Sequence, residues 1–182
     1  MTTLPEEFAT LVSLVNSLDV EANKEDLPDA PSCRAWFQAH GFRPDDSFGE
    51  KHVAAVHRIR EGVRALWRTH NAPQPAPQDA FDNLNGLLSN FPFHWFVANN
   101  GKLVSEQGEG MGGYLDQLVA LLVDASHRPN WHRLKVCQNF GCEWAFYDHS
   151  RNQSHRWCTM TVCGSREKAR RYRARQRNRD LR

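Results

Sequence analysis

The sequence has no long hydrophobic run. Its longest uninterrupted apolar stretch, Leu118 to Val123, covers six residues, far fewer than the roughly 20 that cross a bilayer as a helix. The first ten residues contain two Glu but neither Lys nor Arg, so they lack the cationic start and the apolar stretch of a secretory signal. We therefore expect a cytoplasmic protein with no membrane partner.

Cysteine is almost absent from the first 130 residues, where Cys33 stands alone. Because Cys33 lies beside Trp36 and Phe37, we expect it to be buried as a small apolar residue and to be neither a metal ligand nor a nucleophile. The other four cysteines fall within residues 131–182. In a reducing compartment, clustered cysteines are more often metal ligands than disulfides.

Charge is unevenly distributed, although the net charge is only +2. Residues 1–130 contain 10 Lys and Arg against 17 Asp and Glu, which gives −7, and residues 131–182 contain 13 against 4, which gives +9. Such an asymmetry is typical of a chain whose basic part meets a polyanion, with nucleic acid as the leading candidate. With 182 residues and 40% hydrophobic content, the chain can still bury a core.

Apolar residues recur at steps of three and four in five segments, which predicts helices over residues 8–18, 32–40, 52–70, 79–91 and 115–123. The acidic stretch 21–31 contains two prolines and is predicted to be a loop, as is the glycine-rich stretch 108–113. Asn100-Gly101 lies between strand-like runs at 93–98 and 102–106, which predicts a β-hairpin.

The C-terminal cysteines follow the spacing C-x4-C-x15-C-x4-C, as Cys137, Cys142, Cys158 and Cys163. Two close pairs on either side of a hairpin-sized insert can supply the four soft ligands that tetrahedral Zn²⁺ prefers. We expect one structural zinc ion per chain, because four thiolates leave no open position for a catalytic water. An iron site, two disulfides and four separately buried thiols are the alternatives. His132, His149 and His155 could each replace a cysteine ligand, although surface or phosphate contact is the role expected of them.

The insert between the cysteine pairs contains Trp144, Phe146 and Tyr147, which predicts a short strand packed against the metal site. A module of about 40 residues rarely folds through burial alone, so we expect the metal to supply most of its folding free energy. The sequence thus predicts a mainly α protein with a small β-hairpin. A helix-rich domain over residues 1–130 is followed by a small zinc-binding β-hairpin plus helix module over residues 131–182.

After Cys163, the basic sequence GSREKARRYRARQRNRDLR predicts a helix with Ser165 as its N-cap and Glu167 in its first turn. Ala169, Tyr172 and Gln176 mark the side predicted to face the zinc module. Arginines at helical spacing form a stripe on another side, and arginine suits planar, bidentate contact with phosphate. The residues expected to contact nucleic acid are Arg151, Arg156, Arg166, Lys168, Arg170, Arg171, Arg173, Arg175 and Arg177.

The cysteines, the basic helix and the pattern W-x-F-x-D-x-S-R-N-x-S-x-R-W-C-x-M-x-x-C-G-x-R resemble the CGNR zinc finger of bacterial transcription regulators. In that family the finger follows a larger N-terminal domain, ABATE, which is described as belonging to stress-induced transcription regulators; the segment LVNSLDVE, residues 14–21, is similar to it. The resemblance implies that the four cysteines bind zinc and that a DNA-facing element begins at Arg166. Ser165 stands where the family name has Asn, and it keeps a capping oxygen but loses an amide donor.

These features favour a DNA-binding transcription regulator. The helical domain is expected to sense an unidentified small-molecule effector or to form a homodimer, while the finger places its Arg-rich helix on DNA. One alternative is an RNA-binding module that stacks bases on Trp144, Tyr147 or Trp157. Another is a ligand-binding or interaction protein whose basic tail docks on its own acidic half.

No spacing in the sequence specifies a nucleophile, a general base or a metal triad. The polar residues that could approach one another in the fold are Asn16, Asp19, His57, His94 and Asp116. Each is expected to be a cap, a surface group or a satisfied core residue. We therefore predict no catalytic residue and do not expect an enzyme.

Overall fold

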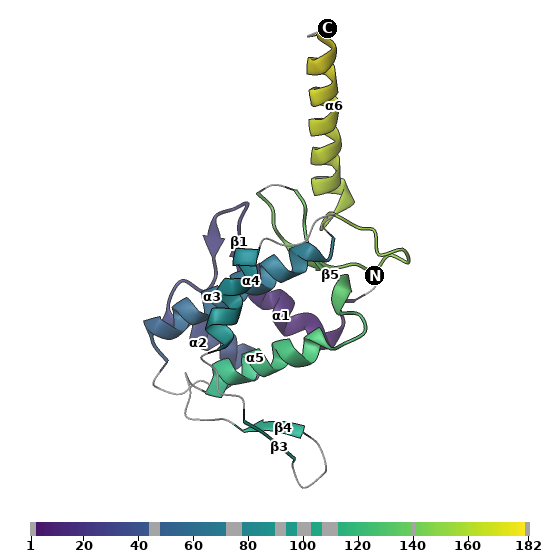
Figure 1. Ribbon diagram of the computed structural model, residues 1–182. Coiled ribbons are helices and arrows are strands. Elements are labelled where there is room, and N and C mark those ends of the chain that lie inside the picture. Colours follow the sequence, from purple (N-terminus) through teal and green to yellow (C-terminus); the bar gives the residue numbers. More distant parts are fainter. Residues whose placement is uncertain are drawn as a thin grey trace.

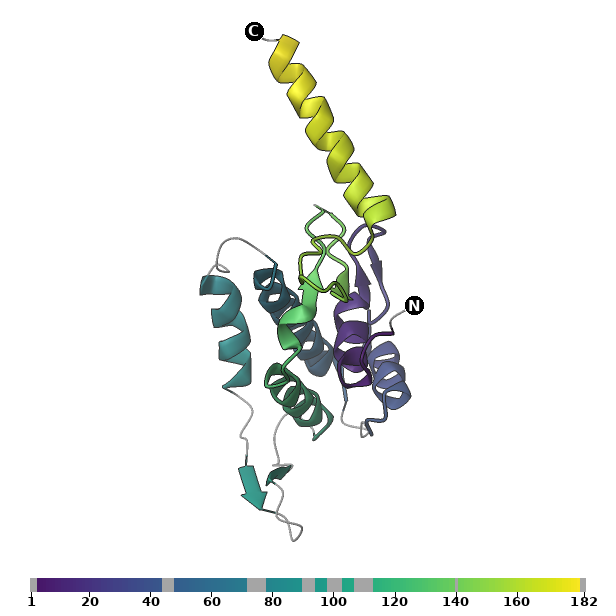
Figure 2. The ribbon, with the colours of Figure 1, turned by 90° about the vertical axis from the view of Figure 1, so that its right-hand side faces the viewer.

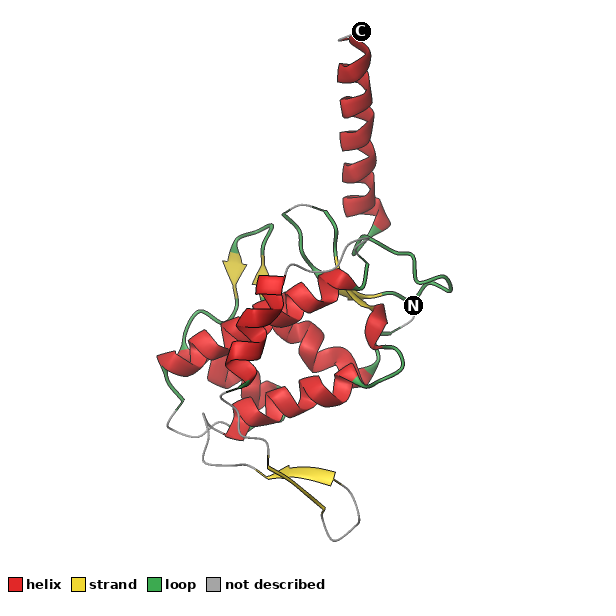
Figure 3. Ribbon diagram, viewed as in Figure 1, coloured by secondary structure: helices red, strands yellow, loops and turns green. Residues whose placement is uncertain are grey.

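The computed structural model describes residues 3–43, 48–71, 78–89, 94–97, 103–106, 113–139 and 141–180. Its α-helices are α1 (Glu6–Asn16), α2 (Ala30–Ala39), α3 (Glu50–Thr69), α4 (Gln78–Leu88), α5 (Gly113–Ser126) and α6 (Ser165–Asp180) (Figure 1). Three antiparallel strand pairs join β1 (Leu18–Asp19) to β2 (Lys24–Glu25), β3 (His94–Val97) to β4 (Leu103–Glu106), and β5 (Leu134–Val136) to β6 (Ala145–Tyr147). The prediction of a mainly α protein with small hairpins is confirmed (Figure 3).

Helix α3 is the central element of the fold. It packs against α1, α2, α4 and β5, and α1 in turn packs against α5 and β6. The strand pair β5–β6 therefore shares the hydrophobic core of the helices. The core side chains from these elements include Phe8, Leu11, Leu14, Val15, Val56, Ile59, Val63, Trp67, Leu115, Leu118, Val119, Leu134, Val136 and Ala145.

The segment between the first two helices differs from the predicted loop. Residues 18–25 form the β1–β2 hairpin, and α2 begins at Ala30, two residues before the predicted start. Asp29 is the N-cap, because its Oδ1 accepts a hydrogen bond from the backbone N–H of Ser32 at 2.9 Å. Proline at the second helical position had suggested a loop, but proline is tolerated in the first turn of a helix.

The predicted hairpin in the middle of the chain is confirmed as β3–β4, with His94 opposite Glu106 and Val97 opposite Leu103. Its Asn-Gly turn and the predicted glycine-rich loop up to residue 112 lie outside the described residues. Among the helices that the structure describes, none combines the length and the apolar content that crossing a bilayer requires.

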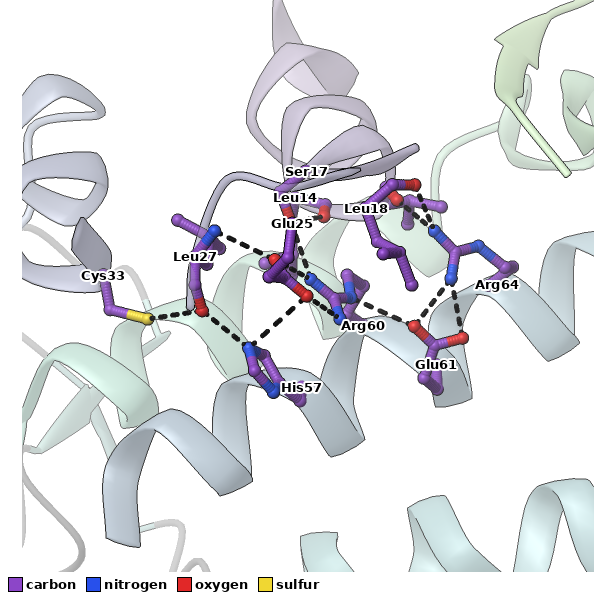
Figure 4. A network of polar contacts seen from close by, with 11 residues as sticks. Leu14, Ser17, Leu18, Glu25, Leu27, Cys33, His57, Arg60, Glu61 and Arg64 are labelled. Carbon is purple, nitrogen blue, oxygen red and sulfur yellow. Dashed lines mark hydrogen bonds and ion pairs between the residues drawn. The ribbon is translucent and has the colours of Figure 1, made fainter. Parts of the chain in front are cut away.

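Two arginines of α3 are buried rather than exposed. Arg60 forms a bidentate ion pair with Glu25, with both N–O distances at 2.7 Å, and also donates to the Ser17 hydroxyl. Figure 4 shows how this contact attaches the β1–β2 hairpin to α3. Burial alone would raise the pKa of Glu25, but the hydrogen bonds from Arg60 hold it below its usual value.

Arg64 closes the end of α1. Its Nη2 donates to the backbone carbonyls of Val15 and Leu18 at 2.5 and 3.2 Å, while its Nη1 binds both oxygens of Glu61 (Figure 4). The last carbonyls of a helix lack intrahelical partners and carry partial negative charge, so a guanidinium satisfies them well. The two buried arginines thus fix the end of α1 and the following hairpin on α3.

Replacing Glu25 by Ala is expected to lower the free energy of unfolding by about 3 kcal/mol, because the buried Arg60 would lose its bidentate partner and keep only Glu61 as a carboxylate partner. Glu25→Gln should lose less, because the amide oxygen still accepts one hydrogen bond. Thermal or urea unfolding measures both. The advantage of the wild type over Glu25→Gln should be complete above the usual carboxyl pKa range and should disappear as the pH falls through the lowered pKa of Glu25.

Asp26→Ala is the matched control. Asp26 pairs with Lys24 at 2.8 Å, but both side chains are more than half exposed, so its loss should cost under about 1 kcal/mol. Equal destabilisation by the Asp26 and Glu25 variants would contradict the role assigned to Arg60.

Candidate metal centre and basic helix

The four C-terminal cysteines come together as a single cluster. The Sγ atoms of Cys137, Cys142, Cys158 and Cys163 all lie within 4.8 Å of one another. Cys158 Sγ is 3.8 Å from Cys142 Sγ and 3.7 Å from Cys163 Sγ. A tetrahedron with Zn–S bonds of about 2.3 Å has S···S edges of about 3.8 Å, so the spacing fits one zinc ion bound by four cysteines.

The first cysteine pair lies on the turn that joins β5 to β6. The Cys137 N–H donates to the Trp144 carbonyl at 2.9 Å, and the Cys142 N–H donates to the Asn139 carbonyl at 3.0 Å. Gly141 has a φ of +87°, a left-handed conformation that glycine adopts without steric cost. The tight turn brings both thiols to the same end of the hairpin.

The second cysteine pair begins with Cys158, and its other member, Cys163, lies in the π-helical turn Met160–Gly164, which continues directly into α6. A Cβ on Gly164 would lie 3.1 Å from the Met160 side chain and 3.3 Å from Trp157, so a larger residue would push these side chains away. Trp157 packs against the cysteine cluster. The Gly that follows the last cysteine is therefore explained by close packing over the metal centre.

The protein environment shifts the pKa values of the Cys142, Cys158 and Cys163 thiols in different directions. Burial raises the pKa of Cys142 and raises that of Cys158 to about 12. Burial would also raise the pKa of Cys163, but hydrogen bonds, the first of them from the Asn139 amide at 3.4 Å, lower it. Zinc must displace protons from buried thiols, so zinc affinity decreases as the pH falls.

Cys33 and the three histidines that could have replaced a ligand do not belong to the cysteine cluster. Cys33 is fully buried in the main core, and burial raises its pKa to about 12. His149 lies against the Tyr147 ring, His155 Nδ1 is 3.6 Å from an oxygen of Asp148, and His132 is exposed.

A buried ion pair organises the loop that leads to the third cysteine. Lys135 Nζ lies 2.8 Å from Asp148 Oδ2 and also donates to the Gln153 carbonyl at 2.5 Å. Asp148 further accepts hydrogen bonds from the N–H and hydroxyl of Ser150 and from the His155 N–H. Burial alone would raise the pKa of Asp148, but these partners, Lys135 first among them, lower it to about 2. Sequence reasoning missed this pair, although Asp-x-Ser is a turn-forming pattern.

The helical body supplies hydrogen bonds to the backbone of the finger. The Asn16 side chain accepts from the Ala145 N–H at 2.7 Å and donates to the Ala145 carbonyl at 3.0 Å. His70 and Asn71, at the end of α3, bind the carbonyls of Leu134 and Val136 at 2.6 and 3.1 Å. These contacts are not visible in the sequence, because each joins residues more than 60 positions apart.

Helix α6 extends away from the rest of the molecule in both ribbon views (Figures 1 and 2). Tyr172 is 63% exposed, so the prediction that it faces the zinc module is wrong. Ser165 is not an N-cap, because it already has helical backbone angles and its hydroxyl donates back to the Met160 carbonyl. The preceding π-turn takes the place of a cap.

The cations predicted to bind nucleic acid fall into two groups. Arg166 pairs with Glu21 at 2.5 Å, and Arg170 and Arg171 both bind Glu167 at 2.7 Å. Hydrogen bonds from Arg170 and Arg171 lower the pKa of Glu167 to about 2. The others are exposed, and their side chains have no hydrogen bond or ion pair with the described residues: Arg151, Arg156, Lys168, Arg173, Arg175 and Arg177.

The aromatic residues considered for base stacking are not equally accessible. Tyr147 stacks on Phe8 of α1 with ring centroids 6.0 Å apart, and Trp157 covers the cysteine cluster. Trp144 is 38% exposed. Packing inside the protein therefore accounts for two of the three aromatic side chains, Tyr147 and Trp157.

The polar residues considered for catalysis contact different parts of the fold. Asn16 binds Ala145, Asp19 accepts from the Ala22 N–H, and His57 binds the Leu27 carbonyl. Burial raises the pKa of Asp116 on α5. His94 lies in β3, and nothing further is described for its side chain.

Comparison with known protein families places two models on the chain. Residues 9–127 match the ABATE family, described as "putative stress-induced transcription regulator", and this match covers more than half of the chain. The chain belongs to the ABATE family. Residues 133–176 match the CGNR zinc finger, so the predicted combination of ABATE domain and CGNR finger is confirmed. No curated protein matches the chain.

We expect the ABATE–CGNR protein, purified without chelator, to contain one zinc ion per chain. Cys158→Ala should lose the metal, because three thiolates leave the site open. Hydrogen exchange should then show lost protection at residues 157–164, while β5 stays protected because Leu134 and Val136 belong to the main core. Because of this shared core, we expect part of the module of residues 131–182 to stay folded after the zinc is lost.

Cys33→Ala is the control for the zinc measurement. It removes a buried thiol from the helical core and should leave the zinc content at one ion per chain. Elemental analysis that finds zinc retained in Cys158→Ala, or lost in Cys33→Ala, would contradict the assignment of the ligands.

Lys135→Met is expected to lower the free energy of unfolding by about 3 kcal/mol, because it leaves the Asp148 carboxylate buried without its charge partner. Lys168→Met is the control, since Lys168 is exposed on α6, and its change should stay within about 0.5 kcal/mol. Urea unfolding at neutral pH compares the two. Similar stabilities would show that the ion pair is not required.

Proposed function

We propose that this protein is a DNA-binding transcription regulator whose zinc finger presents α6 to the DNA backbone. The observation that carries the proposal is a set of exposed cations on a helix that extends from the body, which have no partner among the described residues: Lys168, Arg173, Arg175 and Arg177. The family description supports a regulatory rather than a catalytic role. The zinc finger supports contact with nucleic acid.

The electrostatics of α6 favour a polyanionic partner. Like charges at i,i+4, such as Arg173 and Arg177, repel each other and destabilise an isolated helix. DNA phosphates would remove this repulsion and release counterions. A helix of 16 residues is about 24 Å long, and the major groove of B-DNA admits a helix.

The proposed contacts differ in strength. Arg173, Arg175 and Arg177 would bind phosphate without leaving a partner among the described residues, whereas Arg170 and Arg171 first have to leave Glu167. Arg166 is paired with Glu21 at the base of the helix. We therefore assign the main contacts to the outer half of α6, with the helix-rich domain of residues 1–130 as the sensing or dimerising part.

The opposite arrangement, a basic tail docked on the acidic half, has one described contact in its favour. Within the described residues, Arg166–Glu21 is the ion pair that joins α6 to the helical body. A docked tail would instead bury a row of α6 cations against carboxylates.

Arg173→Gln combined with Arg177→Gln should weaken binding to duplex DNA of any sequence by about tenfold or more at moderate salt. The slope of log affinity against log salt should fall by about 0.9 for each phosphate contact that is lost. Fluorescence anisotropy at several salt concentrations measures both. The melting temperature should not change, because both side chains are exposed and have no partner in the part of the chain that the structure describes.

The control is Arg43→Gln combined with Arg58→Gln, which removes the same charge from exposed positions on the helical body and should leave DNA binding nearly unchanged. Unchanged affinity with a lowered melting temperature in the α6 variant would contradict the proposal and indicate a docked tail. Preference for structured RNA over duplex DNA in competition would indicate the RNA-binding alternative.

A further inference from the structure

A pocket of about 310 Å³ lies between the end of α3 and the loop that leads to the third cysteine. His70 and Asn71 line it from the helical body, and residues 153–156 line it from the finger. Lys135 of β5 completes the wall. Every lining residue is polar or charged, so the pocket suits a polar ligand rather than the apolar molecules that fill most binding pockets.

The charge of the pocket favours an anion. The Lys135 ammonium is saturated, because it contacts Asp148, the Gln153 carbonyl and the His155 carbonyl. The Arg156 side chain is exposed and has no partner among the described residues. A guanidinium presents a planar fork of donors to an oxyanion, so Arg156 is the group available to bind a negative charge.

His70 adds a requirement for a hydrogen-bond donor on the ligand. Its Nδ1 lies 2.6 Å from the Leu134 carbonyl, and because a carbonyl can only accept, Nδ1 carries the proton. Burial lowers the pKa of His70, which favours the neutral ring. In that tautomer Nε2 is an acceptor, and it matches a hydroxyl group.

We propose that this pocket binds a small hydroxylated oxyanion, with Arg156 on the anionic group and His70 Nε2 accepting a hydrogen bond from a hydroxyl. A sugar phosphate and a sugar acid share this chemistry. The volume lies near the lower end of small-molecule sites, so the occupant is a single small metabolite-sized molecule.

The position of the pocket links the ligand to the metal centre. The Arg156 carbonyl accepts from the Gln138 N–H at 2.9 Å, so the loop that carries Arg156 is attached to the residue after the first cysteine. A bound anion would connect this loop to the end of α3 and stabilise the finger on the helical body. The inference does not depend on DNA binding.

Calorimetric titration of the zinc-loaded full chain tests the proposal without DNA. The probes are ribose 5-phosphate and gluconate, and the comparison compounds are ribose and inorganic phosphate, each of which lacks one half of the predicted chemistry. Ribose 5-phosphate, gluconate or both should bind with a Kd below about 1 mM, at least tenfold more tightly than ribose or inorganic phosphate.

Three variants assign the contacts. Arg156→Gln should weaken binding at least tenfold, because it removes a charge-assisted pair. Arg151→Gln removes the same charge from an exposed residue of the same loop that does not line the pocket, and it should bind normally. His70→Asn keeps a donor for the Leu134 carbonyl but lacks the Nε2 acceptor, so it should lose the preference for the hydroxylated probes over inorganic phosphate.

Several results would overturn the proposal. They are the absence of binding by both hydroxylated probes, equal binding of inorganic phosphate, equal weakening by Arg151→Gln and Arg156→Gln, or an unchanged preference in His70→Asn. A melting curve for each variant shows that it is folded. Because no DNA is present, these results are independent of the proposed contacts of α6.

Discussion

The β5–β6 hairpin is too small to be stable without neighbours, and the rest of the structure depends on how it is held. Two strands in isolation are marginally stable at best. The helices pack against the hairpin, whose buried side chains belong to the main core. Asn16, His70 and Asn71 form hydrogen bonds with the hairpin backbone, as a third strand would. The cysteine cluster closes the other end. The positions of the metal centre and α6 follow from these two attachments.

The chain contains two kinds of arginine, and burial separates their roles. Arg60 and Arg64 are buried, and each has carboxylate and other oxygen partners that compensate for the lost hydration. Arg173 and Arg177 are exposed and have no partner among the residues that the structure describes, so neither has to leave a described pair to bind an external anion. Composition counts all four equally, and only their surroundings distinguish them.

Local patterns predicted the helices and the metal ligands well, because both depend on short spacings. The two cysteines of each pair lie five positions apart, a spacing short enough for one turn to bring two thiols together. Ser165 shows the limit of such reasoning. A serine at this position suits an N-cap. The π-turn that contains Cys163 ends directly before Ser165, however, and Ser165 already has helical backbone angles.

The sequence by itself determined the helical class, the zinc ligands and the basic final helix, because periodicity, cysteine spacing and charge are local properties of the chain. Tertiary structure alone decided that the finger shares the helical core, that Lys135 pairs with Asp148, and which cations lack a partner among the described residues. Those outcomes depend on contacts between distant residues, such as Asn16 with Ala145. Nothing in the neighbouring residues of either partner encodes that contact.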